Sequence, residues 1–181
     1  MSVSARTHGP ARTPPHASAA GLVPITVSVL ACPPAICPHV EFALSAQVHA
    51  PVSLEWSQQT ALPGMLCATA DGRVPIGTAG NVAARLRCLD PIWFDVIEGP
   101  MPQGERYSYV PELGMYRADL NANGDVMVSE MRLKDLIARV GSGPSLVEGI
   151  SRLMGESWDG KLEPLRIAGE GGSVSVLRRT G

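Results

Sequence analysis

Residues 25–48 read ITVSVLACPPAICPHVEFALSAQV, and two different hydrophobic periods follow one another within them. In the first six residues, apolar and polar side chains alternate, which predicts a half-buried strand. After Pro33 and Pro34, which a first helical turn tolerates, apolar residues recur at helical spacing. These residues are Ile36, Val40, Ala43, Leu44 and Val48. A strand followed directly by a helix indicates a fold that mixes the two.

The same two patterns continue through the first half of the chain. Strands are expected at residues 25–30, 52–57, 65–70 and 92–97. Asp71 and Gly72 are expected to close the third of these strands. A second helix should begin at Thr78, a residue type that can cap it. The resulting βαββαβ order is that of a ferredoxin-like unit, in which two helices cover one face of a four-stranded antiparallel sheet.

The second half should extend this unit. We expect a hairpin of residues 106–110 and 115–120, a short strand at 126–128, a helix ended by Gly141, a helix from Pro144 to Gly155, and a last strand at 173–177. The fold class is therefore α+β. Residues 24–181 are expected to form a single α+β domain. Residues 1–23 should be a disordered N-terminal tail, because they have almost nothing to bury.

Composition excludes several classes of partner. The chain has 15 Lys and Arg against 17 Asp and Glu, with no basic block, so nucleic acid is not expected. No apolar run is long enough to cross a membrane. Four scattered cysteines indicate reduced core thiols and a cytoplasmic location rather than a disulfide framework. The apolar stretch 21–31 before Cys32 also resembles a lipoprotein signal, but its alternation favours a strand.

Residues 119–130 (DLNANGDVMVSE) match the loop of an EF-hand calcium site. Oxygen donors stand at its first, third, fifth and twelfth positions, and Gly124 would supply the sharp turn. The residues before the loop, however, alternate like a strand instead of forming an entering helix. The alternative is a turn at Asn123 and Gly124, with Ser129 capping the next helix.

Three weaker motifs predict no metal, cofactor or catalytic residue. Cys32, Cys37 and His39 are potential zinc ligands, but their spacing is not that of a zinc site. Cys37 as a nucleophile would need His39 as its base, and residues two apart on a helix point in different directions. Residues 169–172 (GEGG) could cradle a phosphate only before a helix, and a strand is expected there. We interpret that stretch as a flexible turn.

Several stretches together resemble one protein family. They are residues 33–41 (PPAICPHVE), 104–109 (GERYSY), 113–116 (LGMY), 124–125, 132–133, 158–166 (WDGKLEPLR) and 168–171 (AGEG). The family that they resemble is actinobacterial and is called domain of unknown function 3145. The resemblance runs from about Ile25 to the C-terminus. It implies a cytoplasmic protein without an established activity, and an association with fatty-acid synthesis that suggests an acyl-carrier protein or a synthase subunit as partner.

Our leading hypothesis is a non-catalytic binding or regulatory protein. Exposed aromatic and arginine side chains anchor interfaces, so we expect the binding surface to be formed by Arg106, Tyr107, Tyr109, Arg117 and Trp158. Stacking of RNA bases on the aromatics of the same strands, with Trp93 and Tyr116, is the alternative, but the glycine and basic residues of that signature are missing.

Two further functions stay open. One is a small-molecule enzyme acting on an acyl compound or another metabolite, with acid and base groups drawn from Glu105, Asp159, Glu163 and Glu170. For Asp159, Glu163 and Glu170, solvated charges around a loop are the far commoner case. The other is calcium binding by residues 119–130.

Overall fold

A computed structural model describes residues 21–99 and 104–177 of the chain. Most of the predicted tail, residues 1–20, lies outside the described residues. The prediction that the tail reaches residue 23 is wrong, because the first strand, β1 (Leu22–Cys32), begins earlier. Its alternating side chains confirm the strand interpretation of this stretch. No helix in the described ranges is long and apolar enough to cross a membrane.

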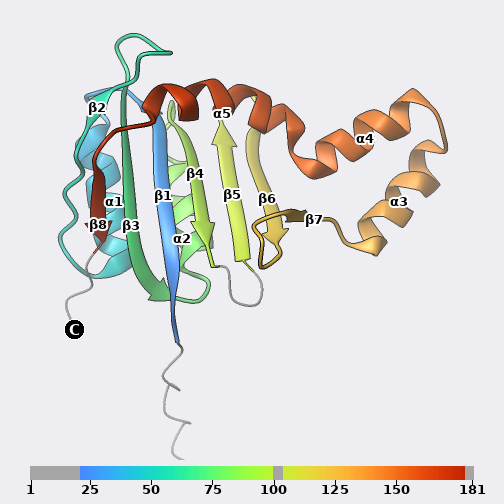
Figure 1. Cartoon of the computed structure of the whole chain (residues 1–181), viewed down its shortest axis with the longest axis horizontal. Helices are drawn as coiled ribbons and strands as arrows, with labels where there is room; N and C mark the ends of the chain where they lie inside the picture. Colours follow the sequence, from blue (N-terminus) through green and yellow to red (C-terminus); the bar gives the residue numbers. More distant parts are fainter. Residues whose placement is uncertain (1–20, 100–103, 178–181) are drawn as a thin grey trace, which may run out of the picture.

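The described strands form one open sheet of eight (Figure 1). After β1 they are β2 (Ser57–Gln58), β3 (Leu66–Pro75), β4 (Trp93–Glu98), β5 (Gly104–Val110), β6 (Gly114–Leu120), β7 (Val126–Met127) and β8 (Val174–Leu177). The order in the sheet is β2-β3-β1-β4-β5-β6-β7, with β8 also beside β3. Every pair is antiparallel except β3 and β8.

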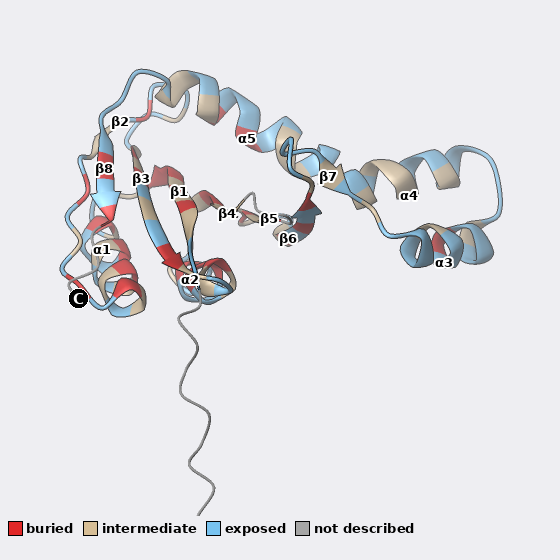
Figure 2. Ribbon diagram, turned by 60° about the horizontal axis from the view of Figure 1, so that its bottom comes forward, coloured by how far each residue is buried: buried red, intermediate tan, exposed pale blue. Residues whose placement is uncertain are grey.

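Helices cover the two faces of this sheet unequally (Figure 2). The helices α1 (Cys37–Val48) and α2 (Thr78–Leu86) lie on one face. On the other face a single helix, α5 (Glu156–Gly169), crosses one end of the central strands. The remaining two helices, α3 (Glu130–Val140) and α4 (Pro144–Met154), project beyond β6 and β7 as a hairpin. We call residues 130–154 the arm, and the rest the body.

The main hydrophobic core lies between the sheet and helices α1 and α2. The alternating residues of β1 and β4 meet the helical stripes there, and Val40, Val82 and Phe94 are almost completely excluded from solvent. A smaller core lies under α5, where Leu162 and Leu165 pack on Leu30, Ala31 and Val110. The expected α+β class, the two first-half helices and the second-half hairpin are confirmed.

The predicted strand 52–57 is wrong except at Ser57. β8 occupies the edge of β3 that this strand would need, pairing with residues 69–72. The N–H of Glu55 donates to Ser175 Oγ of β8 at 2.9 Å, so the segment runs alongside β8 without joining the sheet. The C-terminal strand therefore displaces a local one.

The predicted end of the third strand at Asp71 and Gly72 is also wrong, because β3 continues to Pro75. Asp71 accepts a hydrogen bond from Thr26 on the neighbouring strand at 2.6 Å. A side chain would not fit at Gly72, because a Cβ there would lie 2.6 Å from the Cβ of Leu177 on β8. This glycine permits a close strand approach and is not part of a turn.

Two details of the helices differ from expectation. Gly77, not Thr78, is the N-cap of α2, and the carboxylate of Glu98 accepts the N–H groups of Gly77 and Ala79 at 2.6 and 2.7 Å. Residues 156–169, for which no helix was predicted, form α5 and include Pro164. The second half therefore has three helices among its described residues instead of two.

Candidate functional site

The five residues predicted to form one binding surface lie on opposite faces of the sheet. Successive side chains of a strand point to opposite faces, and Arg106 and Tyr107 are successive residues of β5. Tyr107, Tyr109 and Arg117 lie on the face covered by α1 and α2. Arg106 and Trp158 lie on the face crossed by α5. The structure therefore does not bring the five together.

On the α1 and α2 face, the two tyrosines pack against the core. Tyr109 stacks on Phe94 with 5.4 Å between ring centroids, and burial raises the pKa of both tyrosine hydroxyls. Arg117 pairs with Glu105 and lies 5.9 Å above the ring of Tyr107. This group is a packed edge of the core with one exposed guanidinium.

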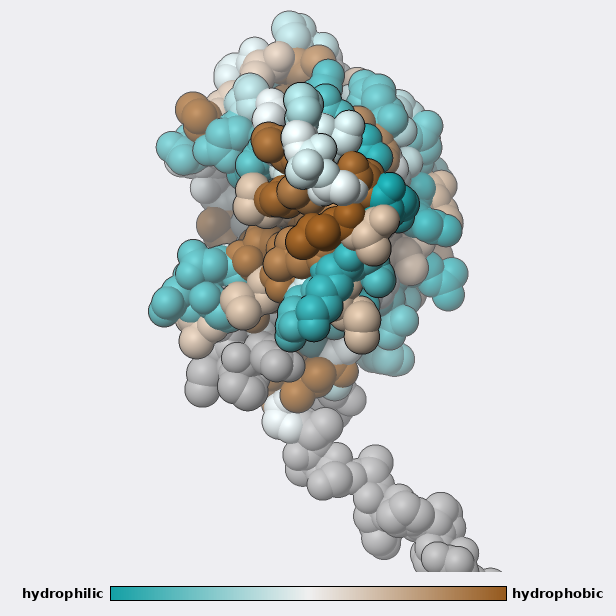
Figure 3. Space-filling view, turned by 90° about the vertical axis from the view of Figure 1, so that its right-hand side faces the viewer, coloured by the Kyte–Doolittle hydropathy of each residue, from teal (hydrophilic) through white to brown (hydrophobic). Residues whose placement is uncertain are grey.

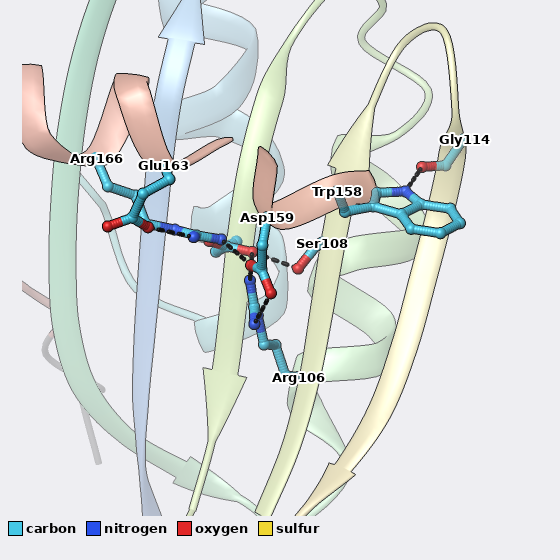
Figure 4. Close-up of polar contacts among 8 residues, drawn as sticks. Arg106, Ser108, Gly114, Trp158, Asp159, Glu163 and Arg166 are labelled. Atoms are coloured by element: carbon cyan, nitrogen blue, oxygen red, sulfur yellow. Dashed lines mark hydrogen bonds and ion pairs between the residues drawn. The ribbon is translucent and has the colours of Figure 1, made fainter. Parts of the chain in front are cut away.

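On the α5 face, charged residues of the sheet and the helix form an ion-pair network (Figure 4). It consists of Asp95 on β4, Arg106 and Ser108 on β5, and Asp159, Glu163 and Arg166 on α5. The three helical members are spaced by four and three residues, so they share one side of α5. Asp95 is the least accessible of the charged members, at 5% exposure.

Asp95 is the acceptor that joins the sheet to the helix. The Nε and Nη2 atoms of Arg166 donate to its Oδ2 at 2.8 and 2.6 Å, and the hydroxyl of Ser108 donates to its Oδ1. Arg106 donates to Asp95 and to Asp159, but its buried Nε has no partner among the described residues. Two guanidinium groups thus face three carboxylates.

The network fixes the ionisation of Asp159. Partial burial opposes ionisation, but the hydrogen bonds and charges of Arg106 and Arg166 outweigh it, and the pKa of Asp159 lies below its usual value. Burial likewise opposes the charge of Arg166, and the carboxylate of Asp95 raises its pKa in return. A carboxylate held ionised in this way is a poor general acid near neutral pH.

The four carboxylates predicted as acid and base candidates do not form one group. Asp159 and Glu163 both bind Arg166, whereas Glu105 lies on the opposite face and binds Arg117 and Tyr107. Glu170 lies past the end of α5, beside a cleft. The ion pairs around Arg166 hold α5 on the sheet. We call the network of Asp95, Arg106, Ser108, Asp159, Glu163 and Arg166 the clasp.

Trp158 belongs to a second anchor, at the root of the arm. Its indole N–H donates to the carbonyl of Gly114 at 2.9 Å, and its ring stacks on Tyr116 with 5.1 Å between centroids. The Tyr116 hydroxyl in turn donates to the carbonyl of Leu153 at the end of α4. Gly155, which joins α4 to α5, has a φ of 82°, and a Cβ there would meet the Tyr116 ring at 2.5 Å.

A cleft of about 250 Å³ opens between the C-terminal end of α5 and strands β1 and β3. Residues 169–173 form one wall, and Ser28 and Thr69 form part of the floor. The hydroxyls of these two residues make no hydrogen bond to other residues in the described ranges. The cleft therefore has two hydroxyls without a partner among the described residues. They lie beside Arg166, whose own donor groups already bind carboxylates.

The arm has little covering. Leu136 is its one buried side chain among the described residues, and α4 buries none. Met131, Ile137 and Val147 are 69%, 53% and 65% exposed. Seen from the arm end, apolar side chains form a band across the molecule with hydrophilic groups on both sides (Figure 3).

The family model described as protein of unknown function (DUF3145) matches residues 26–179. The chain belongs to the DUF3145 family. The resemblance drawn from the sequence motifs is thereby confirmed. No curated protein and no solved structure matches this chain.

Three cysteines of the DUF3145 chain are buried, as expected for core thiols, whereas Cys88 is exposed. The sulfur atoms of Cys32 and Cys37 lie 3.8 Å apart. Burial raises the pKa of both thiols, which opposes the thiolate that a nucleophile or a zinc ligand needs. No cluster of three or more His, Cys, Asp or Glu suited to a metal occurs in the residues described.

The calcium-like loop of this DUF3145 chain is a turn between β6 and β7. The Oδ1 atom of Asn121 accepts the N–H groups of Asn123 and Asp125 at 2.8 and 2.9 Å. Ser129 caps α3 by accepting the N–H of Arg132. The turn and the cap are confirmed, and a strand, not a helix, enters the loop.

Sequence reasoning missed Asp95 and Ser108, which hold α5 in the DUF3145 structure, and it considered Tyr116 only as an aromatic that could stack on RNA bases. A signal for Asp95 was present, because a carboxylate inside the otherwise apolar run WFDVI at 93–97 needs a buried partner. Its partner Arg166 stands on a helix that was not predicted, so the pair could not be formed from the sequence.

Proposed function

We propose that this DUF3145 protein is a non-catalytic binding module, and that the arm is the surface with which it engages a protein partner. The observation that carries the proposal is the exposure of apolar side chains along both arm helices. Contiguous exposed apolar surface flanked by polar groups is typical of interaction sites. Amphipathic helices are a common element of such surfaces.

The body supports this proposal because its contacts hold the base of the arm in place. The ion-pair network fixes α5 to the sheet, and the contacts of Tyr116 fix the junction of α4 and α5. Arg106 and Trp158 would then position the arm without touching the partner. This differs from a surface made of the five residues first considered.

The test uses the two lysines of the chain, Lys134 on the arm and Lys161 on α5. Tagged protein is crosslinked in its native cells with an amine-directed reagent, and the products are identified by mass spectrometry. We expect partner crosslinks at Lys134 in excess of those at Lys161. The double variant Ile137→Asp, Val147→Asp should lose the partner.

Phe42→Asp is the matched control for this experiment. Phe42 is 76% exposed on α1, far from the arm, so the substitution places one carboxylate at an exposed apolar position of the body, as each arm substitution does in the arm. If the partner is recovered with the arm double variant as fully as with Phe42→Asp, the proposal is refuted.

The family resemblance gives the first partners to titrate, an acyl-carrier protein or a synthase subunit in the cytoplasm. Purified candidates are added to the wild type and to the arm double variant, and heat of binding is measured. Saturable heat with the wild type and none with the variant would support this choice. Equal heats would place such a partner elsewhere on the molecule.

The cleft favours a second candidate, a binding site for a small polar molecule. Its free hydroxyls on Ser28 and Thr69 can accept or donate hydrogen bonds. A metabolite that binds there should raise the melting temperature of the wild type, and Thr69→Val should abolish the rise. An unchanged rise in Thr69→Val would exclude the cleft as its site.

We also propose that the first half is a ferredoxin-like unit. Support comes from the order β2-β3-β1-β4, its antiparallel pairings, and the location of α1 and α2 on one face. In this unit β8 would extend the edge strand that β2 begins.

A further inference from the structure

We propose that the arm pairs with the arm of a second copy of this chain, so that two helical hairpins form a four-helix bundle. This inference rests on the proposed function, because it takes the arm as the binding surface and names the partner.

The arm helices need an additional surface to cover them. Each has 11 residues, and isolated helices of that length are marginal in water, since most helical stability comes from packing of an apolar face. Within the hairpin, Leu136 packs against Gly149, where a Cβ would meet its side chain at 2.5 Å. Leu133, Val140, Leu146 and Ile150 are partly buried, whereas Ile137 and Val147 remain exposed.

The open stripes have the geometry of a bundle interface. On α3, Leu133, Ile137 and Val140 recur at intervals of four and three residues, and on α4 Val147, Ile150 and Met154 recur at intervals of three and four, so each set lies on one side of its helix. Two antiparallel helices that each carry such a stripe form half of a four-helix bundle. A second copy supplies the other half with the same spacing.

The charges of the arm favour a second copy over a strongly charged partner. Its exposed basic residues are Arg132, Lys134, Arg139 and Arg152, and its exposed acidic residues are Glu130, Asp135 and Glu148. A two-fold interface brings a patch against itself, so the patch must carry both signs to find complements. An acidic protein would be attracted by a predominantly basic surface, and the arm does not have one.

The position of the arm permits this pairing. It extends beyond β6 and β7, away from α1 and α2, so two bodies would lie at opposite ends of the bundle (Figure 1). The clasp on α5 holds the arm root in each copy and leaves the apolar band accessible.

The experiment is sedimentation velocity of the full chain over a wide range of concentration. We expect the wild type to show twice the mass of one chain at high concentration. Ile137→Asp with Val147→Asp should raise the dissociation constant by roughly a hundredfold or more, because each would bury an unpaired charge at the centre of the interface. Phe42→Asp should leave it unchanged.

Circular dichroism shows whether the double variant retains its folded body. Its dissociation constant is compared with that of the wild type once this is established. A second, conservative variant, Val147→Ala, should weaken the dimer less. A dimer that withstands the charged double variant would overturn the inference. A wild type that stays monomeric would also overturn it, but the proposed function would survive if a different partner still depended on the arm. If the double variant keeps both the dimer and the complex with another partner, the inference and the proposed function are both overturned.

Discussion

The body and the arm use apolar residues of the same kind in opposite ways. On α2, the stripe of Val82 and Leu86 is closed off by the sheet, and Phe94 beneath it has no solvent exposure. On α4, an equally regular stripe buries no side chain. The arm is therefore the part of the chain whose stability is not provided by the chain's own core.

This difference separates two kinds of information in a hydrophobic pattern. Periodicity states that a helix has a face to bury, but it does not state which surface covers that face. In the body the cover lies within the chain. In the arm the described residues leave Ile137 and Val147 uncovered, which is why we propose the interaction surface there.

The largest expected effect is that of Phe94→Ala. Removing a fully buried ring that stacks on Tyr109 should lower the free energy of unfolding by about 3–5 kcal/mol. Val147→Ala, in the open stripe of the arm, should change it by less than about 0.5 kcal/mol in dilute solution. Urea denaturation measures both. Comparable losses would mean that the arm is already covered within one chain.

Asp95→Ala should come next, at about 3 kcal/mol. The substitution leaves the guanidinium groups of Arg106 and Arg166 beneath α5 without their shared buried acceptor. Glu163→Ala removes an exposed carboxylate from the same network and should cost at most about 1 kcal/mol. If the two variants unfold at the same urea concentration, the network does not act as the clasp.

A smaller effect is expected from Gly155→Ala at the arm root, about 1–3 kcal/mol. The substitution imposes a side chain at positive φ and against the ring of Tyr116. Amide hydrogen exchange should then accelerate in α4 and remain slow in α2. Gly160→Ala is the control, because a Cβ at this helical position meets nothing, and it should be neutral or slightly stabilising.

The sequence was sufficient for most elements of the fold because their hydrophobic periods are regular. β1, α1, the β5 and β6 hairpin and both arm helices lie where alternation or helical spacing placed them. The errors occur where distant segments meet. β3 extends past Gly72 because residues 73–75 pair with residues 22–24 of β1. Strand 52–57 is lost because β8, from the far end of the chain, lies at that edge.

The candidate site was less predictable for two physical reasons. Strand alternation alone separates Arg106 from Tyr107, so the division of the predicted surface could have been read from the sequence. The clasp could not, because it requires α5, whose sequence contains Pro164 and Gly160 and has a weak apolar stripe. The openness of the arm is a property of the packed chain and has no sequence signature.

The pH dependence of stability should distinguish the clasp from ordinary surface charge. The folded-state pKa of Asp159 lies below its ordinary value of 3.8, so as pH falls the unfolded chain takes up this proton first. The stabilisation by Asp159 is therefore present above about pH 3.8 and is lost as pH falls through the lower, folded-state value. Asp159→Asn should lower stability at neutral pH by less than Asp95→Ala does, since Asp159 is partly exposed.

The measurement for Asp159 is the difference in urea midpoint between the wild type and the variant, taken as a function of pH. The difference should shrink below pH 3.8. Glu112→Gln is the control for this measurement, because it removes one carboxylate from the exposed turn between β5 and β6, outside the clasp. A difference that persists at low pH would mean that Asp159 stabilises by shape and not by charge.

The smallest expected effect is that of calcium, which would act at the joint between body and arm. Residues 121–129 connect β6 to α3, so an ion bound there would stiffen the arm on the body. The Oδ1 of Asn121 is already engaged by two N–H groups, and Asp119 lies 3.7 Å from the guanidinium of Arg117. Calcium at about 1 mM, the range of weak sites, should therefore leave the melting temperature unchanged. A rise with calcium that magnesium does not reproduce, and that Asp125→Asn removes, would show that the turn rearranges to bind the ion and that the joint is regulated.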